Sequence, residues 1–577
     1  MSARDADGAA NKSRVGEPAP AFSLKDTAGK IHDLDLYRSK KAVVVVFSGN
    51  GCPLLQQYLP RLTELAAEYA KHGVQFLAIN SNRQDSLQEI AAHAKENSLT
   101  FPVLKDDRNV VADQFGARRT PEAFVIDQQG VIRYRGRIDD QFGVGYQRPA
   151  IGRRDLATAI AEVLAGKPVS TPETEAAGCL IGRVTQPRDQ GVTYANQVAR
   201  IIQNRCQTCH RPGQVGPFTL LNYSDASGWG PMSKEVVQEK RMPPWHADPQ
   251  HGKFTNDRSL TSNELATLVA WVDSGMPEGN ASDLPPPRQF SEEWALGKPD
   301  HVLQMSEEFT VPASGRDMYR YFRLPTGLEE NRWVRAVEIR PGNRRVVHHV
   351  IAMVRDANTE QRQSRPLGAL LAPVMGTGNS TSAMGWLAAM APGNEVMVYP
   401  PATAKLLPAG CNIVFQMHYH PSGVEEKDRT SIGLYYSDEP SLELMRTYGI
   451  ANPLFAIPPG AKNYEIKGLV TTPADVKLWS LMPHMHLRGH DIQYRAVYPD
   501  GNSEMLLAVP RWDFNWQTTY RLTEPKSLPK GTRVEVIAHY DNSADNPNNP
   551  TPNESVRWGE PTHMEMMIGF VDYTLDR

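Results

Sequence analysis

Seven of the chain's 16 histidines fall in three short stretches, "VVHHVIAMV", "QMHYHPSG" and "LMPHMHLRGH". Imidazole nitrogens bind zinc, copper, iron and nickel, so histidines grouped among apolar residues form a candidate metal site. One such pair could lie on a wet surface by chance. Three pairs within one region of the chain predict metal binding.

The spacing within each stretch determines how its histidines can meet. His484 and His486 stand two residues apart, so on a strand their side chains share a face. His418 is followed at the same spacing by His420. The adjacent His348 and His349 would point to opposite faces of a regular strand. Their binding to one ion therefore requires a strand end or a β-bulge.

Methionines near the C-terminus offer a softer kind of ligand. The stretch "WGEPTHMEMMIGFVDY" contains Met564, Met566 and Met567. Thioether sulfur favours Cu(I), which would distinguish copper from zinc. Methionines on a strand also fill hydrophobic cores, and by composition alone that interpretation is preferred.

A haem-type spacing of ligands lies in "RCQTCHRPG". In Cys206-x-x-Cys209-His210, two thiols can form thioethers with a haem while the imidazole binds its iron. The alternative, half of a zinc site, lacks a second cysteine pair to complete it. The other three of the five cysteines stand singly, which excludes a disulfide scaffold; they are Cys52, Cys179 and Cys411.

Cys52 is a candidate reactive thiol. In "FSGNGCPLLQQY" it follows an apolar run and begins a helical pattern. The helix dipole and the unpaired N–H groups at a helix N-terminus favour a thiolate there.

Length and charge limit the class of protein. A chain of 577 residues is too long for one core, and we expect three or four domains. The net charge of -3 arises without a basic stripe, so neither nucleic acid nor an anionic membrane is an expected partner. The longest strongly apolar run, residues 42–47, is far shorter than the roughly 20 residues of a membrane helix, so no membrane-spanning segment is expected.

The elements that position Cys52 alternate between strand and helix. "KAVVVVFSG" predicts a buried strand, "PLLQQYLPRLTELAAEYAKHG" a helix, and "EAFVIDQQGVIRYRGRI" a hairpin around Gln129 and Gly130. This alternation predicts a layered α/β domain.

The elements around the haem-type spacing are helical. "YANQVARIIQNRC" and "TSNELATLVAWVDSG" both carry apolar residues at helical spacing. The second has a capping box, Thr261 with Glu264, and a terminating Gly275. We expect a small all-α domain here.

The histidine stretches lie among short alternating strands separated by Gly, Pro and Asn turns, which predict β-sandwiches. Their length of almost 290 residues, from about residue 288, favours two sandwiches. The predicted organisation is a disordered tail (1–14), an α/β domain (15–166), a linker (167–190), a helical domain (191–282), a linker (283–298) and two β-sandwiches (299–440 and 441–577).

The first domain resembles the thioredoxin-like AhpC/TSA redoxin family. The order strand, Cys52, proline, helix matches, and Thr120-Pro121 in "RRTPEAFVID" corresponds to the family's cis-proline beside the reactive cysteine. The second cysteine of a thioredoxin would stand at Leu55, which excludes exchange through C-x-x-C. Peroxiredoxins have Thr or Ser where this chain has Gly49. A one-cysteine peroxidase, a partnership with Cys179 and an inert or regulatory thiol all remain open.

The helical domain resembles c-type cytochromes. In that family a methionine of an "MPP" loop supplies the second axial ligand, and "RMPPWHADP" places Met242 there. One covalent haem c held by Cys206, Cys209, His210 and Met242 is implied, and a His/Met iron of this kind is an electron carrier. Three other residues remain alternatives for the second ligand: His246, His251 and Met232.

The β region resembles the type II copper, ascorbate-dependent monooxygenases, the peptidylglycine α-hydroxylating and dopamine β-hydroxylating family. That family has tandem jelly-roll sandwiches with one copper on each. Its His-His pair followed by a Q-x-H-Y strand matches His348, His349 and His418, which implies the electron-transferring copper. Its H-x-H strand and terminal D-E-M stretch match a second set, which implies the oxygen-binding copper: His484, His486 and Met566.

The chain departs from this family at several positions. Met564 replaces an acidic residue, which leaves open which of the three methionines binds copper. Cys411 is the only cysteine of this half, so the disulfides of the animal enzymes are absent. His420 and His490 fall outside the pattern, and we expect them to support ligands or lie on the surface.

Together the resemblances imply a multidomain oxidoreductase. Its copper monooxygenase half would hydroxylate a C–H bond with O2, with electrons supplied through the haem and the redoxin domain. The alternatives are a thiol-dependent peroxidase or redox sensor acting through Cys52, with a copper-binding half that does not hydroxylate, and an interaction scaffold with incidental histidines. The substrate, a small molecule or a peptide, is not indicated, and the electron donor would be ascorbate-like or a redox protein.

The sequence gives conflicting indications of the cellular location of this protein. Covalent haem attachment and copper loading both favour the periplasm or another extracytoplasmic site. The first residues, "MSARDADGAANKSRV", are polar and show no apolar core of a secretory signal. We expect an extracytoplasmic protein despite this.

Overall fold

The computed structural model describes residues 14–148, 150–188, 191–291, 293–313, 315, 317–356, 385–391, 396–439 and 442–576. The expected N-terminal tail (1–14), apart from its last residue, and the expected boundary between the sandwiches at 440 and 441 lie outside these residues. The chain divides into two compact units: one runs to Pro243 and includes Ser259–Pro287, and the other comprises Pro244–Arg258 and everything from Arg288.

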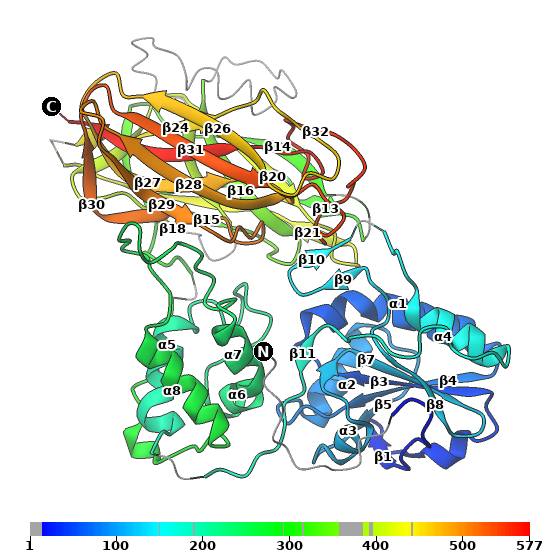
Figure 1. Cartoon of the computed structure of the whole chain (residues 1–577). Coiled ribbons are helices and arrows are strands. Elements are labelled where there is room, and N and C mark those ends of the chain that lie inside the picture. The colour runs from blue at the N-terminus through cyan, green and yellow to red at the C-terminus, as the bar shows by residue number, and fades with distance from the viewer. Residues whose placement is uncertain are drawn as a thin grey trace. The chain divides into compact units, whose positions relative to one another are not determined.

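The first unit begins with the predicted α/β domain (Figure 1). Its seven-stranded sheet has the order β2-β1-β5-β4-β3-β7-β8, in which β3, β4 and β5 are parallel. Every residue of β3 is buried, as expected of a strand covered on both faces. The strands are β1 (Ser23–Asp26), β2 (Ile31–Asp33), β3 (Ala42–Ser48), β4 (Val74–Asn80), β5 (Val103–Lys105), β7 (Glu122–Asp127) and β8 (Ile132–Gly136).

Helices cover this sheet, and the longest begins at the candidate thiol. Cys52 is the N-cap of α1, and Pro53 occupies the first helical position, where its missing N–H costs nothing. The predicted hairpin is present, with Gly130 at a φ of 79° in the turn between β7 and β8. The helices are η1 (Leu34–Tyr37), α1 (Pro53–Ala70), α2 (Leu87–Glu96), α3 (Val110–Phe115) and α4 (Asp155–Leu164), and a small ribbon is formed by β9 (Phe142–Gly143) and β10 (Tyr146–Gln147).

The stretch expected to be a linker, 167–190, contributes a strand to the first unit. In it, β11 (Cys179–Leu180) pairs antiparallel with β6 (Arg119–Thr120), directly before the cis peptide bond between Thr120 and Pro121. The predicted cis-proline is therefore confirmed, and the linker returns to the edge of the α/β domain.

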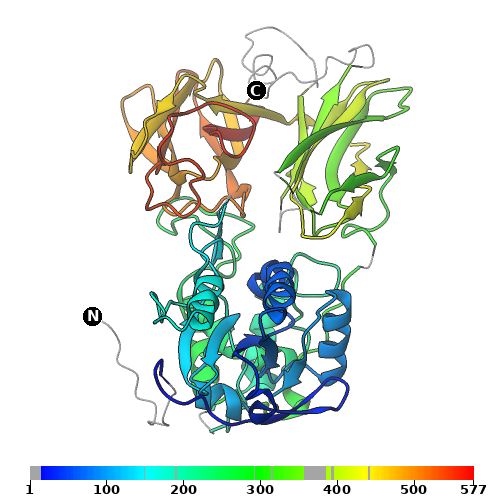
Figure 2. The same ribbon diagram turned by 90° about the vertical axis from the view of Figure 1, so that its right-hand side faces the viewer.

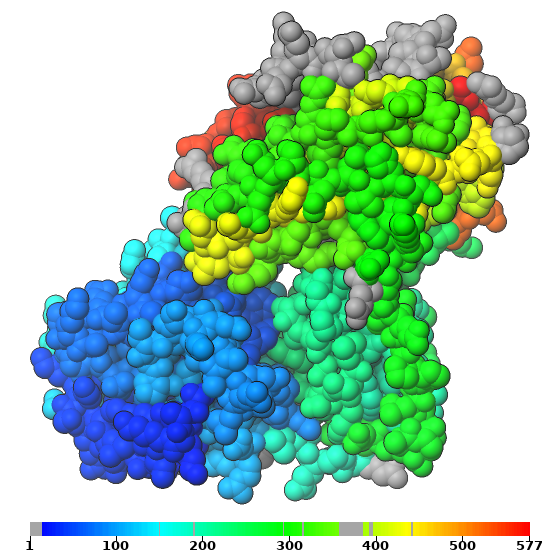
Figure 3. All heavy atoms as spheres, turned by 180° about the vertical axis from the view of Figure 1, so that it is seen from behind, coloured from blue at the N-terminus to red at the C-terminus, as the bar shows by residue number. Residues whose placement is uncertain are grey.

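The helical segment completes the first unit. The predicted capping box at Thr261 is present, and buried Trp271 packs within the segment. One hydrophobic core includes residues of both this segment and the α/β domain, and Figure 3 shows their atoms in contact, in teal and blue. The helices are η2 (Tyr194–Val198), α5 (Ala199–Arg205), α6 (Tyr223–Gly228), α7 (Gly230–Gln238), α8 (Ser262–Asp273) and η3 (Ala281–Asp283).

The second unit is mainly β, and Figure 2 shows its two sandwiches side by side. In the first, a four-stranded sheet β14-β20-β16-β17 shares a core with a larger sheet of β12, β22, β15, β19, β23 and β18. The strands are β12 (His301–Gln304), β13 (Phe309–Val311), β14 (Met318–Pro325), β15 (Arg332–Arg340), β16 (Val347–Arg355), β17 (Gly385–Met390), β18 (Val396–Val398), β19 (Thr403–Leu407), β20 (Asn412–Tyr419), β21 (Glu426–Asp428), β22 (Ser431–Tyr436) and β23 (Glu443–Leu444).

The second sandwich pairs the sheet β24-β33-β27-β30 with the sheet β26-β31-β28-β29. Between the sandwiches, the buried Lys405 ammonium donates hydrogen bonds to Thr447 Oγ1 at 2.5 Å and to Trp386 O at 3.1 Å. The strands are β24 (Arg446–Ala451), β25 (Ala456–Ile457), β26 (Tyr464–Thr471), β27 (Val476–His484), β28 (Gly489–Val497), β29 (Ser503–Val509), β30 (Tyr520–Leu528), β31 (Arg533–Tyr540), β32 (Val556–Arg557) and β33 (Ile568–Leu575).

One stretch of the expected helical domain (191–282) belongs to the second unit. Residues 244–258 pack on the second sandwich, where Phe254 forms a bridge with Leu522. Trp245 and Phe254 place their rings 4.9 Å and 5.4 Å from that of Tyr520. Ring contacts with Tyr520 therefore hold this stretch on the sandwich. None of the described helices is long and apolar enough to cross a membrane.

Candidate metal and thiol sites

Three predicted ligands come together on the four-stranded sheet of the first sandwich. His348 and His349 lie on β16, and His418 lies on the neighbouring β20 as the direct partner of His349. The register shifts between Val347 and His349, so His348 is the extra residue of a β-bulge. The bulge turns His348 to the same side of the sheet as His349, which is the condition that we expected for their binding to one ion.

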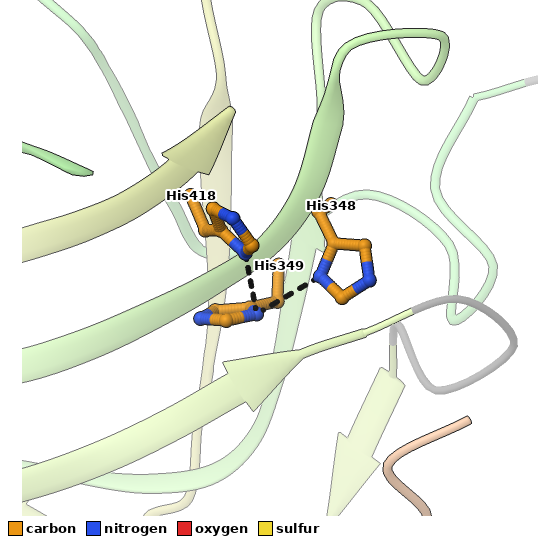
Figure 4. Close-up of side chains that lie close together, drawn as sticks. All are labelled: His348, His349 and His418. Atoms are coloured by element: carbon orange, nitrogen blue, oxygen red, sulfur yellow. Dashed lines mark hydrogen bonds between the residues drawn. The ribbon is translucent and has the colours of Figure 1, made fainter. Parts of the chain in front are cut away.

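The three imidazoles converge through their Nδ1 atoms (Figure 4). The Nδ1 of His349 lies 3.1 Å from that of His348 and 3.3 Å from that of His418. One ligand nitrogen of each side chain lies within 4.8 Å of the others. Two imidazole nitrogens that bind one ion at about 2.0 Å in tetrahedral geometry stand about 3.3 Å apart, so the separation fits a shared metal.

Hydrogen bonds alone do not explain this cluster. Each neutral imidazole has one N–H and one acceptor nitrogen, so the Nδ1 of His349 can satisfy only one of its two neighbours fully. The Nε2 of His348 is buried and has no hydrogen-bond partner. Burial lowers the pKa of His348 to about 3 and that of His349 further from its usual range, so both are neutral and their lone pairs are available.

Asp317 holds the orientation of this site. Its carboxylate accepts a hydrogen bond from His418 Nε2 at 2.8 Å and from His420 Nδ1 at 2.7 Å. Burial by itself would raise the pKa of Asp317, but these two hydrogen bonds hold it well below the usual range. The hydrogen bond to Asp317 directs His418 Nδ1 towards the other histidines. His420 contacts Asp317 and is therefore placed beside the group that supports His418. Sequence reasoning missed Asp317 because nothing in "SGRDMYRY" marks it.

The second set of histidines lies where β27 ends. His484 Nδ1 donates to Gln517 Oε1 at 2.7 Å, and His486 Nδ1 donates to Met564 O at 3.1 Å. Both rings therefore keep Nε2 as the nitrogen for a ligand, with ring centroids 5.2 Å apart and ring planes perpendicular. Burial lowers the pKa of His484 to about 4.

Glu565 joins the loop between β27 and β28, which contains His486, to the methionine stretch. Its buried carboxylate accepts from the N–H groups of His486, Arg488 and Met566 at 2.9, 2.7 and 3.3 Å. Burial raises the pKa of Glu565 to about 7, although these N–H groups act against the rise. This acidic residue therefore fixes the backbone on which the second site is built.

The three methionines have different surroundings. Met567 is fully buried in the core of the second sandwich. Met564 packs against Gly559 and supplies the carbonyl that holds His486. Met566 belongs to a separate small cluster outside that core, with Ile568 and Phe570. Met567 is therefore the only one of the three that belongs to the main core of the second sandwich, and Met564 and Met566 lie outside that core.

Phe514 lies between the two histidine sets. Its ring stacks on His348 at a centroid distance of 5.0 Å and lies 6.1 Å from the ring of His486. An apolar ring excludes water from the space that it fills. A single aromatic in a loop before β30 gave no signal in the sequence that it would contact both sets.

In the helical segment, His210 has the orientation that a ligand needs. Its Nδ1 donates to Phe218 O at 3.1 Å, which leaves Nε2 for a metal. Cys206 and Cys209 are thiols, and burial raises the pKa of Cys206 to about 12.

The structure separates the alternatives for a second axial ligand. Met232 accepts a hydrogen bond at its sulfur from the N–H of Leu180 at 3.4 Å, and His246 and His251 belong to the second unit. Met242 lies in the same unit as His210.

Cys52 is 1% exposed and lies against the cis-proline strand. Its thiol donates to Thr120 O at 2.9 Å, and its sulfur accepts from Leu55 N at 3.5 Å. Burial alone would raise the pKa of Cys52, but hydrogen bonds from Cys179 and the helix N-terminus lower it below the usual range of a cysteine.

Comparison with known proteins covers the α/β domain. Residues 15–135 match the AhpC/TSA family. The thiol-disulfide oxidoreductase ResA of Geobacillus thermodenitrificans is 34% identical over 119 residues, which are 21% of this chain and 67% of that protein. The chloroplastic peroxiredoxin Q of Populus jackii is 27% identical over 129 residues, 21% of this chain and 59% of that protein.

Among solved structures, the hypothetical protein SMc02350 of Sinorhizobium meliloti is 32% identical and covers 30% of this chain and 96% of its own length, with a TM-score of 0.28. The family match ends at residue 135. The histidine sites and the haem-type spacing therefore depend on their own geometry.

Proposed function

Since this chain belongs to the AhpC/TSA family through residues 15–135, we propose that it is a modular oxidoreductase in which a redoxin domain and a haem-binding segment serve a copper-dependent monooxygenase. The proposed reaction inserts one oxygen atom of O2 into a C–H bond: R–H, O2, two electrons and two protons give R–OH and water. The match of residues 15–135 to the AhpC/TSA family supports the redoxin part of this proposal.

The convergence of His348, His349 and His418 carries this proposal. The Nδ1 of His349 lies at separations from the other two Nδ1 atoms that fit one shared ion, and no assignment of protons satisfies all three by hydrogen bonds. All three side chains are buried or half-buried, so chance proximity on a solvent-exposed surface does not explain the cluster.

The second set of residues favours copper over zinc. His484 and His486 offer two Nε2 atoms, and Met566 offers a soft thioether, a combination that suits Cu(I). When bound, copper would supply one-electron chemistry with O2. Glu565 fixes the backbone of His486 and Met566, and Gln517 and the Met564 carbonyl hold the ring tautomers.

The helical segment would supply electrons. Cys206 and Cys209 would attach a haem c, and His210 Nε2 with Met242 would bind its iron. A full set of axial ligands makes such a haem an electron carrier. Its external donor would be ascorbate-like or a redox protein, and haem attachment favours an extracytoplasmic location.

Metal analysis tests this proposal directly. The chain is produced in a host with the c-type haem maturation machinery, and copper, zinc and iron are counted per chain. We expect two copper ions and one iron, and reductant-dependent O2 consumption that is lost in Met566→Ala.

The matched control is Met567→Ala, which changes the neighbouring methionine, whose side chain lies in the core of the second sandwich. Both variants are first compared by thermal unfolding so that a loss of fold is recognised. Zinc in place of copper, or O2 consumption that survives Met566→Ala, contradicts the monooxygenase.

A second function is favoured by the lowered pKa of Cys52. A thiol-dependent peroxidase or thiol-disulfide oxidoreductase would use this thiolate as its nucleophile. Cys52→Ser abolishes that activity and leaves reductant-dependent O2 consumption at the copper sites. The two functions are therefore measured independently in the same chain.

A further inference from the structure

Cys52 does not lie alone in the α/β domain. The thiol of Cys179 is hydrogen-bonded to the sulfur of Cys52. Cys179 is also the cross-strand partner of Thr120, whose carbonyl accepts the Cys52 thiol. Two cysteines 127 positions apart in sequence therefore meet at the cis-proline edge of the sheet.

Several contacts hold the second cysteine in place. Arg119 donates to Gly178 O at 2.7 Å, and Gly178 has a φ of 139° and approaches the Thr120 backbone so closely that a Cβ would lie 2.0 Å from its carbonyl. On the other side, Leu180 N donates to the sulfur of Met232, and Gly182 N donates to Asn82 Oδ1 at 2.9 Å. The position of Cys179 is thus fixed from both ends of β11.

The surroundings give the two thiols different roles. Hydrogen bonds at the N-cap of α1 stabilise a thiolate on Cys52, which makes it the nucleophile. The nearby Cys52 sulfur and burial raise the pKa of Cys179, so it keeps its proton while Cys52 is ionised. A pair of this kind has one attacking and one resolving member.

The other described cysteines have different surroundings. Position 55, where a C-x-x-C motif has its second cysteine, is Leu55. Cys411 lies in the second unit, with its sulfur 3.8 Å from Thr326 Oγ1. Cys206 and Cys209 belong to the haem-type spacing.

We propose that Cys52 and Cys179 form a reversible intramolecular disulfide, so that the linker strand β11 supplies the resolving cysteine that the redoxin domain itself lacks. This inference rests on the thiol chemistry proposed for Cys52 and is independent of copper. The substrate class is a disulfide, RSSR.

The exchange is balanced in two steps. The Cys52 thiolate attacks one sulfur of RSSR, the S–S bond breaks, and RS⁻ leaves and takes up a proton. The Cys179 sulfur then attacks the Cys52 sulfur of the mixed disulfide, gives up its proton, and displaces the second RS⁻. In sum, two protein thiols are oxidised to a disulfide, and RSSR is reduced to two RSH.

The covering of the site determines how a substrate enters. Cys52 and Cys179 are 1% and 9% exposed, and the side chain of Trp229 packs directly over Gly51. β11 is only two residues long, and local opening of so short a strand requires few broken hydrogen bonds. Entry of RSSR therefore requires β11 to leave the edge and Cys179 to return.

Peptide mapping of the unmodified chain tests the pairing. The full-length protein is equilibrated in dithiothreitol redox buffers, remaining thiols are alkylated, and the digest is analysed by mass spectrometry. We expect a peptide pair that joins Cys52 to Cys179, with a mass lower by two hydrogens, formed in one two-electron transition. Full alkylation of both thiols under oxidising conditions, or a pairing of Cys52 with another cysteine, overturns the inference.

A trapping experiment tests the order of attack with dithiobis(nitrobenzoate) as the disulfide. Wild-type protein should release two thiolates per Cys52–Cys179 pair. Cys179→Ser should release one and retain the aryl thiol on Cys52, and Cys411→Ser should behave as wild type. If Cys179→Ser also releases two, the inference fails while the thiol function of Cys52 stands. If Cys52 does not react at all, both fail.

Discussion

The two histidine sites of the second unit orient their imidazole rings through different nitrogen atoms and different supporting groups. In the first, three Nδ1 atoms converge from a bulged strand and its neighbour, and a carboxylate holds one ring from behind. In the second, a neutral amide and a backbone carbonyl hold two rings by Nδ1, so Nε2 faces the site. A methionine is the remaining candidate ligand there.

Under the copper proposal, this difference would give the two sites different tasks. An all-imidazole site backed by the charge of Asp317 favours a tightly held ion. A site of two imidazoles and a thioether, backed by neutral groups, favours Cu(I) and an open position. Phe514 packs against both sets of histidines, so the same apolar ring borders both sites.

The largest expected effect follows from removing a ligand of the first site. His418→Ala should reduce bound copper from two ions to one, because His418 is fully buried and contributes one of the three converging nitrogens. His420→Ala, directly after the end of β20, is the control and should retain both ions. Equal loss in the two variants, measured by metal content, would contradict the assignment of His418.

Met566→Leu should separate the sites by oxidation state. Leucine keeps the volume but lacks sulfur, so affinity for Cu(I) at the second site should fall while the first site is unchanged. Competition with a Cu(I) chelator measures this. Met567→Leu, in the sandwich core, should leave both affinities as they are; an equal loss in both variants would remove Met566 from the ligand set.

Asp317→Asn should weaken the first site only. Loss of an outer hydrogen-bond partner typically lowers metal affinity by about 10–100-fold, and a charged partner belongs at the upper end. Gln517→Leu removes a neutral partner from the second site and should cost about 10-fold there. If isothermal titration shows the Gln517 variant to be the weaker binder, the contrast between charged and neutral support is wrong.

The smallest effect on affinity is expected from Phe514→Leu. The ring is not a ligand, so copper content should stay at two ions. The electron paramagnetic resonance spectra of both Cu(II) ions should change together, because the ring packs against both sets. Phe455→Leu is the control, since Phe455 packs on Tyr540 and Trp558 instead. A change in one spectrum alone would show that Phe514 affects only one of the two sites.

Local sequence rules predicted the elements and the ligand spacing. The buried strand before Cys52, the hairpin at Gly130 and the capping box at Thr261 depend on neighbouring residues, and all three are confirmed. The sequence also required a bulge or a strand end if His348 and His349 were to meet, and β16 has the bulge.

Contacts between distant residues could not be predicted in this way. Asp317 reaches His418 across 101 positions, and Gln517 reaches His484 across 33. Neither lies in a motif, because a single carboxylate or amide has no periodicity that marks it. The placement of residues 244–258 on the second sandwich also depends on aromatic packing that local spacing does not contain.

By itself, the sequence determined which residues can ligate or react, since residue type and short spacing are local properties. The tertiary structure decided which nitrogen of His418, His484 and His486 is left for a ligand, because the other nitrogen is held by a group from elsewhere in the chain. It also decided that the linker carries Cys179 back to Cys52, since a two-residue strand has no sequence pattern of its own and exists only through its pairing with β6.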